Sequence, residues 1–226
     1  MDIYFIMWGK MNQASSTLLI HNEEVDSIFE TLGTKENNLS YGVGYVLSKS
    51  PRLLKSLIKK VYDRKLKFKD IVIRLQESGE DRGFTDFEIT IDNEFFCIIE
   101  AEKGWNLPDL KQLKKYRRRF RGYKKTKRLY IILSDCSYEY FDDNMPFSLY
   151  GVPLESITWD DVIKSINVVR PHGTNKEKYT LSELKDYLQK VVQMENKESN
   201  WVYVVSLAHG KPRWSKLSWR DIVAKK

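Results

Sequence analysis

Hydrophobic and polar residues alternate over residues 84–91, which is the pattern of a β-strand with one face against a core. The next two residues, Asp92 and Asn93, both tolerate the positive φ angles of a tight hairpin turn. Residues 95–101 are apolar almost throughout, as is typical of a strand that is buried on both faces. The sequence therefore predicts a β-hairpin with a buried second strand. In the first strand of this hairpin one face carries Phe84, Asp86, Glu88 and Thr90, and the other face carries Phe87, Ile89 and Ile91.

Further helices and strands on both sides of this hairpin predict an α/β fold. The predicted helices cover residues 22–33, 39–47 and a segment that begins at Pro51, and the predicted strands cover 70–77 and 129–134. A helix capped by Asn106 or Asp109 joins residues 95–101 to 129–134. Because a strand–helix–strand crossover joins parallel strands, we expect 95–101 and 129–134 to pair in parallel.

The C-terminal part of the chain predicts a smaller α/β extension. A capped helix over 158–166, a capping box at 180–183 that opens a helix to about Met194, a strand over 201–207 and a last helix from Ser218 are expected. Residues 167–180 contain Pro171, His172 and Gly173 and indicate a linker. We therefore expect a core at 1–166 and a strand and helix extension at 167–226 that packs on it.

Composition narrows the class of protein. The chain has 226 residues, the length of one domain with or without an appendage. Its formal net charge of +7 favours a polyanionic partner. Cys97 and Cys136 are too few for a disulfide framework or a cysteine metal cluster, which predicts a reducing, cytoplasmic setting. No apolar run approaches the roughly 20 residues that span a bilayer, so no membrane is expected as a partner. The sequence leaves open whether the chain forms a homodimer.

Carboxylates gather where the buried strand ends. Period-2 geometry places Glu100 and Glu102 on one face and Lys103 on the other, and a hairpin in register brings Asp86 beside the two glutamates. Like charges this close resist joint ionisation, and a hard divalent cation such as Mg²⁺ relieves the repulsion. The alternative is a solvated strand end with Asp86 in a surface salt bridge.

The order Asp86, Glu100-x-Glu102, Gln112-x-x-x-Tyr116 resembles the PD-(D/E)XK nuclease superfamily, in particular its RecB-like branch with a QxxxY helix. The resemblance covers roughly residues 36–135. It implies a restriction-endonuclease-like core with a mixed central sheet flanked by helices. It also implies that Asp86 and Glu100 bind Mg²⁺ or Mn²⁺ and that Gln112 and Tyr116 line the site.

Two further site residues follow from this resemblance. Many members of the superfamily carry a glutamate on the helix before the hairpin. Glu36 is the candidate for this glutamate and would be the third metal ligand. Its alternative role is that of a helix-start carboxylate stabilised by the helix dipole. The family lysine position holds Glu102, and Lys103 comes one residue late. Either Glu102 or Lys103 would then position the attacking water.

A basic run follows the carboxylates. Eleven of the eighteen residues from Lys111 to Arg128 are Lys or Arg, and none is acidic. Tyr116, Phe120 and Tyr123 are interleaved with them, a mixture that suits phosphate contacts and base stacking. The alternative is a solvated helix face. The expected nucleic-acid-binding residues are Lys111, Lys114, Lys115, Arg117, Arg118, Arg121 and Lys124.

Together these features predict a Mg²⁺- or Mn²⁺-dependent endodeoxyribonuclease that hydrolyses phosphodiester bonds in DNA, with RNA as the alternative substrate. The resemblance places such an enzyme in defence or DNA processing. One rival is a nucleic-acid-binding module derived from such a nuclease, with its chemistry impaired by the displaced lysine. The other is a structural or partner-binding domain whose carboxylates are ordinary surface charges.

Overall fold

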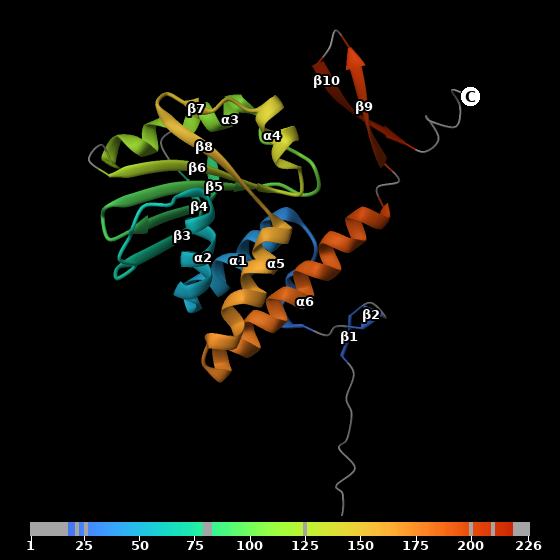
Figure 1. Ribbon diagram of the computed structural model, residues 1–226. Coiled ribbons are helices and arrows are strands. Elements are labelled where there is room, and N and C mark those ends of the chain that lie inside the picture. The colour runs from blue at the N-terminus through green and yellow to red at the C-terminus, as the bar shows by residue number, and fades with distance from the viewer. Residues whose placement is uncertain are drawn as a thin grey trace, which may run out of the picture.

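The chain forms an α/β fold around a mixed, open, six-stranded sheet (Figure 1). The computed structural model describes residues 18–20, 23–24, 27–78, 83–123, 126–198, 201–208 and 211–218. The strands, in sheet order, are β3 (Ile71–Ser78), β4 (Phe84–Ile91), β5 (Phe95–Ala101), β6 (Lys127–Ser134), β8 (Val152–Thr158) and β7 (Ser148–Leu149). β3, β4 and β5 pair antiparallel in that order, whereas β5, β6 and β8 are parallel. The expected α/β class and the parallel pairing of β5 with β6 are confirmed.

The central hairpin has the bounds that its sequence pattern predicts. Asp92 and Asn93 have φ angles of 51° and 54°, and the Glu94 N–H donates to the Ile91 carbonyl at 3.0 Å. The Asp92 carboxylate also accepts the backbone N–H groups of Lys69 and Asp70, at 2.9 and 2.8 Å. These bonds tie the turn to the start of β3. All seven residues of β5 are buried, as expected of a strand with neighbours on both sides.

Four helices lie on one side of the sheet, three of them against its strands and the last, α6, against the helices. They are α1 (Glu36–Lys49), α2 (Pro51–Val61), α5 (Trp159–Val169) and α6 (Asn175–Glu198) (Figure 1). The helices predicted at 39–47 and from Pro51 are confirmed, with the Ser50 hydroxyl capping α2 through the Leu53 N–H at 3.3 Å. A Cβ at Gly44 would lie 2.5 Å from a Leu75 methyl group, so a glycine here lets α1 lie close to β3.

The opposite face is covered by α3 (Leu110–Lys115), the 3₁₀-helix η2 (Tyr116–Tyr123) and α4 (Tyr138–Asn144). Asp109 caps α3 by accepting the Lys111 N–H at 2.8 Å, as one of the two predicted caps. Tyr116 and Phe120 are only 1% and 2% exposed, because their spacing of four residues turns both rings onto the sheet. The expectation that these two rings stack on bases is therefore wrong.

The predicted N-terminal helix is shorter than expected. β2 (Glu23–Glu24) lies where the sequence predicts the first turn of this helix, and it pairs with β1 (Leu19–Ile20). The 3₁₀-helix η1 (Ile28–Leu32) begins only after Ser27, whose hydroxyl accepts the Phe29 N–H at 3.2 Å. The Ser27 cap, close to the buried ring of Phe29, therefore sets the first residue of η1. Gly33, with φ of 92°, ends the helix as predicted.

The linker predicted at 167–180 is wrong. α5 continues to Val169, the 3₁₀-helix η3 (Arg170–His172) follows, and α6 begins at Asn175. Thr180 lies inside α6, where its hydroxyl donates to the Lys176 carbonyl at 2.9 Å instead of forming the expected capping box. The cap is the Thr174 hydroxyl, which accepts the Glu177 N–H at 3.3 Å. The division at residue 166 stays a prediction. The α6 side chains that pack into the main core are Leu181, Leu184, Tyr187, Leu188 and Val191.

The remaining C-terminal predictions have mixed outcomes. The capped helix at 158 is confirmed, since Thr158 and Asp161 form a complete capping box at the start of α5. The predicted strand is β9 (Trp201–Ala208), which pairs antiparallel with β10 (Lys211–Ser218), a strand that was not expected. The helix predicted from Ser218 lies, beyond that residue, outside the described residues. Both cysteines are free and buried. Within the described ranges, no helix is long and apolar enough to cross a membrane.

Candidate functional site

Asp86 is held between the two neighbouring strands of the sheet. Its position continues the β4–β5 register in which Phe87 faces Ile99, so it lies opposite Glu100. One carboxylate oxygen accepts the Ala101 N–H at 2.8 Å, and the other accepts the Gln76 side-chain amide at 2.7 Å. Asp86 is only 6% exposed. The predicted neighbourhood of Asp86 and the β5 carboxylates is therefore present.

Glu100 points to the QxxxY helix. Its Oε2 accepts the Gln112 side-chain amide at 2.9 Å, and the same amide donates to the Tyr116 hydroxyl at 3.1 Å. The Tyr116 hydroxyl in turn donates to the Phe84 carbonyl at 2.6 Å, at the start of β4. The spacing of four residues thus places Gln112 and Tyr116 on one helical face beside Glu100, as predicted.

The second oxygen of Glu100 lacks a hydrogen-bond partner among the described residues. This Oε1 atom is fully buried, and the whole residue is 3% exposed. A buried polar atom without a partner is unusual and destabilising, because it has lost its bonds to water and gained none from the protein. An oxygen of this kind is suited to bind a cation.

Glu36 and Glu102 meet at the edge of this cluster. Their carboxyl groups share a hydrogen bond, and Glu36 also accepts the backbone N–H of Lys103. Glu36 is both the first residue of α1 and a neighbour of the carboxylates, so its two proposed roles are compatible. The sequence alone could not tell whether α1 begins close enough to the sheet.

Burial is the first cause that raises the pKa of all four carboxyl groups, and repulsion between them adds to it in three. Burial and then Asp86 raise the pKa of Glu100 to about 9, although Tyr116 opposes the shift. Burial, Glu36 and Asp86 raise the pKa of Glu102 to about 7. Burial and then Asp86 raise the pKa of Glu36, and burial raises that of Asp86. The cluster therefore retains protons near neutral pH.

The donor set fits a hard divalent cation, with rearrangement. In the described part of the chain, no three His, Cys, Asp or Glu side chains are arranged as ready metal ligands. The Asp86 oxygens accept protein N–H groups, and Glu36 is bonded to Glu102. Carboxylate oxygens are nevertheless the ligands that Mg²⁺ and Mn²⁺ prefer, and Glu100 Oε1 is unsatisfied. Asp86, Glu100 and Glu36 would hold such an ion once their carboxyl groups are ionised.

The end of β5 brings both Glu102 and Lys103 to the cluster. The Glu102 N–H donates to the Leu133 carbonyl at 2.8 Å, and the Trp159 indole donates to the Glu102 carbonyl at 2.9 Å. Gly104 then turns the chain with φ of 62°. The charge of Lys103 is close enough to Glu36 to lower the pKa of that carboxyl against the effect of burial. Both candidates for the family lysine role thus remain open.

Gln76 is a site residue that sequence reasoning missed. It donates the bond that orients Asp86, and it lies inside β3 with φ of 50°. A non-glycine residue in this conformation is strained, and such strain is concentrated at functional sites. Gln76 occupies an ordinary polar position in an alternating strand, so no sequence signal distinguishes it.

Arg119 belongs to the basic run but not to its surface. Its side chain is 8% exposed and donates to the Glu88 carboxylate at 2.5 Å. It also donates to the Glu77 and Gly83 carbonyls, both at 2.7 Å. Arg119 thus holds the ends of the β3–β4 connection.

The exposed cations of α3 and η2 form what we call the basic surface. It lies on α3 and η2, which carry Gln112 and Tyr116 on their sheet-facing side. Lys124 lies outside the described residues. The exposed members of the basic surface are Lys111, Lys114, Lys115, Arg117, Arg118 and Arg121.

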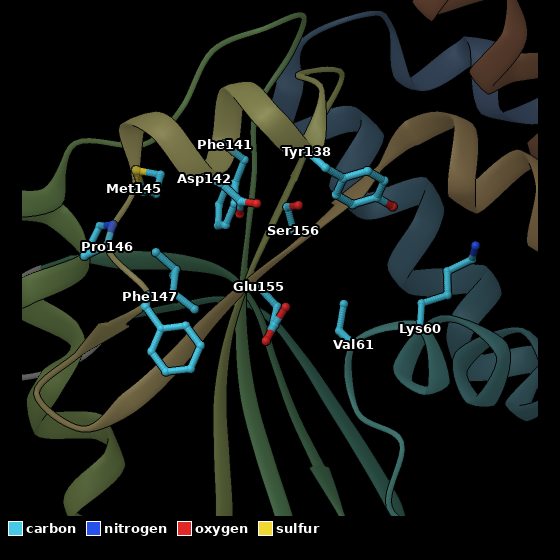
Figure 2. A pocket seen from close by; sticks show the side chains of 11 residues that line it. Lys60, Val61, Tyr138, Phe141, Asp142, Met145, Pro146, Phe147, Glu155 and Ser156 are labelled. Atoms are coloured by element: carbon cyan, nitrogen blue, oxygen red, sulfur yellow. The ribbon is translucent and has the colours of Figure 1, made fainter. Parts of the chain in front are cut away.

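A cavity of about 560 Å³ lies elsewhere, between β8, α4 and the end of α2 (Figure 2). Lys60, Tyr138 and Glu155 are among its lining residues, and none of the cluster residues is. Asp161 accepts hydrogen bonds from Lys60 at 2.9 Å and from the Tyr138 hydroxyl at 2.5 Å. The candidate chemistry therefore lies at the end of β5 and not in this cavity.

Family models, curated proteins and solved structures give no match for this chain. Evidence for a function accordingly comes from the carboxylate cluster and the basic surface themselves.

Proposed function

We propose that this protein is a Mg²⁺- or Mn²⁺-dependent nuclease of the PD-(D/E)XK type that hydrolyses phosphodiester bonds in DNA. The observation that carries the proposal is the buried Oε1 of Glu100, which has no hydrogen-bond partner among the described residues. Glu100 lies opposite Asp86, and its other oxygen, Oε2, accepts a bond from Gln112. The order of α1, three antiparallel strands, α3 and the parallel strand β6 supports a restriction-endonuclease-like core.

The roles of the chain's own residues follow from their contacts. Asp86 and Glu100, with Glu36, would bind the ion, which when bound polarises the phosphate and lowers the pKa of water. Gln112 orients Glu100, and Gln76 orients Asp86. These two amides therefore act as positioning residues.

Glu102 is suited to accept a proton. Its pKa is raised to about 7 by burial, Glu36 and Asp86, which is near the value that favours a general base at neutral pH. Lys103 is suited to bind an oxygen of the scissile phosphate as a point charge. This assignment predicts that Glu102 governs the chemical step and that Lys103 governs mainly binding.

The basic surface would hold the nucleic-acid backbone. Its exposed cations contact phosphates without reading bases, because phosphate contacts position a strand but carry no sequence information. DNA is proposed as the substrate, in preference to RNA, on the family resemblance alone. RNA is therefore included as a separate substrate in the cleavage experiment below.

The second candidate is a nucleic-acid-binding module with impaired chemistry. Glu102 occupies the position of the family lysine, and Lys103 follows one residue later. This rival retains the basic surface and predicts binding without metal-dependent cleavage.

A substrate panel distinguishes these functions. Purified protein is incubated with linear duplex, circular duplex, single-stranded DNA and RNA, each with Mg²⁺, Mn²⁺ or EDTA. Glu100→Gln serves as the matched control. The proposal expects metal-dependent cleavage by the wild type only, and cleavage of circles would identify an endonuclease. Binding without cleavage supports the impaired module, and neither binding nor cleavage supports a structural domain.

A further inference from the structure

An exposed tyrosine in a strained turn lies against the basic surface. Tyr150 and Gly151 form the two-residue turn between β7 and β8, where Leu149 pairs with Val152. Their φ angles are 53° and 75°. Asn or Gly adopts this conformation readily, whereas a bulky side chain is strained in it. The Tyr150 ring, 54% exposed, is thus displayed to solvent at an energetic cost.

Arg117 holds this ring in place. The Arg117 guanidinium lies 4.3 Å from the centroid of the Tyr150 ring, within the range of a cation–π contact. Arg117 is the second residue of η2 and is itself exposed. An arginine next to an exposed aromatic ring combines the two groups that bind single-stranded nucleic acids, a phosphate contact and a stacking surface.

The position of Tyr150 relative to the carboxylates follows from the sheet register. Glu100 is level with Ile132 in β6, which is level with Ser156 in β8. Tyr150 precedes β8 and so lies towards the opposite end of these parallel strands, on the order of 20 Å from the Glu100 level at about 3.3 Å per residue. α3 and η2 form the crossover from the end of β5 back to the start of β6, and the basic surface lies along this return.

We propose that Tyr150, backed by Arg117, is a stacking site for an unpaired base of a single strand that extends from the carboxylates along the basic surface. The inference rests on the proposed function and specifies its substrate as DNA with a single-stranded segment. A base within a duplex is stacked on its neighbours and cannot offer a face to the ring, so the site selects unpaired bases.

The test compares wild-type protein with Tyr150→Asn. Asparagine tolerates positive φ, so this variant removes the ring while relieving the backbone and is expected to be at least as stable as the wild type. Tyr179→Ala is the matched control, because Tyr179 is 67% exposed on α6. Binding is measured in EDTA for three ligands: a 12-nucleotide oligothymidine, its fully abasic analogue and a 12-base-pair duplex.

The expected result is a loss of affinity of about fivefold to a hundredfold for the oligothymidine in Tyr150→Asn, as for the loss of one base–aromatic stack. The abasic analogue and the duplex should bind both proteins alike, and Tyr179→Ala should bind all three ligands as the wild type does. Equal oligothymidine affinity in wild type and Tyr150→Asn would overturn the inference and leave the proposed nuclease untouched. Failure of the wild type to bind any of the three ligands would count against both.

Discussion

Glu100 is the residue on which the proposed chemistry depends most. One of its oxygens is bonded to Gln112 and the other is buried without a partner in the described structure. The protein therefore stabilises the ionised carboxyl group of Glu100 only in part. Either a cation or a proton bound at this carboxyl group would relieve the cost of burying its charge.

This balance predicts how stability depends on pH. The pKa values of Glu100 and Glu102 are raised to about 9 and about 7, against ordinary values of 4.5 in the unfolded chain. Above about pH 5 the unfolded chain has released protons that the folded protein still holds. The contribution of both groups to stability is therefore full below the unfolded pKa and is lost as pH rises towards the folded values.

Denaturant unfolding in EDTA at pH 5, 7 and 9 checks this expectation. Glu100→Gln removes one of the two groups, so the fall in unfolding free energy with pH should be shallower than in the wild type. Glu94→Gln is a matched control, because Glu94 is exposed in the hairpin turn. Equal pH profiles for wild type and Glu100→Gln would show that Glu100 ionises as an ordinary carboxyl.

A second residue-scale prediction separates Glu102 from Lys103. With Glu102 as the general base, Glu102→Ala should lower the single-turnover cleavage rate by about 100-fold or more. Lys103→Ala should then weaken DNA binding with little effect on the rate at saturation. The reversed pattern would identify Lys103 as the displaced family lysine. No effect of either substitution on a measurable Mg²⁺-dependent rate would remove both residues from the catalytic set.

At the scale of elements, Arg119 and Arg118 offer adjacent arginines with opposite roles. Arg119→Ala leaves Glu88 buried and unpaired, and should lower the unfolding free energy by about 3–5 kcal/mol. Arg118→Ala removes an exposed cation and should change stability by less than about 0.5 kcal/mol. Denaturant unfolding of both variants tests whether Arg119 forms a buried ion pair and Arg118 is an exposed cation. Similar destabilisation by the two substitutions would contradict the buried ion pair.

The salt dependence of DNA binding should increase with the number of phosphates that the basic surface binds. Neutralising Lys114, Arg118 and Arg121 together should make the log–log salt dependence of binding shallower by about one unit for each phosphate that is no longer bound. Binding should weaken equally for unrelated sequences, because no base is read. Fluorescence anisotropy at several salt concentrations measures both effects. An unchanged slope would assign these cations to solvent alone.

The local elements of this fold could be predicted and their assembly only in part. The hairpin bounds follow from period-2 alternation and turn chemistry, and the QxxxY face follows from helical spacing. The predicted start of α6 is wrong because Thr180 has the residue type of a cap, while the cap that is used is Thr174 and the helix begins at Asn175. Residue type alone does not show which of several possible caps is used.

The candidate site shows the same limit. Asp86 and Glu100 could be placed together because strand register decides their neighbours, whereas Gln112 was placed at the site only by the family resemblance. The strained φ of Gln76 and the burial of Arg119 depend on contacts between segments far apart in sequence. Such contacts leave no periodic signal in the chain.

At the scale of the whole molecule, two features are joined by one crossover. The carboxylate cluster lies at the end of β5, and α3 and η2 lead from it with the basic surface. A cluster of carboxyl groups with raised pKa values and a surface of exposed cations have a common explanation if a cation and a nucleic acid bind together. The nuclease proposal depends on that link.

Single-turnover cleavage of saturating single-stranded DNA, compared in wild type and Glu100→Gln with Mg²⁺, tests this link most directly. We predict metal-dependent cleavage by the wild type and a rate at least about 100-fold lower in Glu100→Gln, since the variant loses a metal ligand. DNA affinity in EDTA should be equal in the two proteins. Equal cleavage rates, or a wild type that binds DNA and does not cleave it with Mg²⁺ or Mn²⁺, would contradict the proposed metal-dependent nuclease.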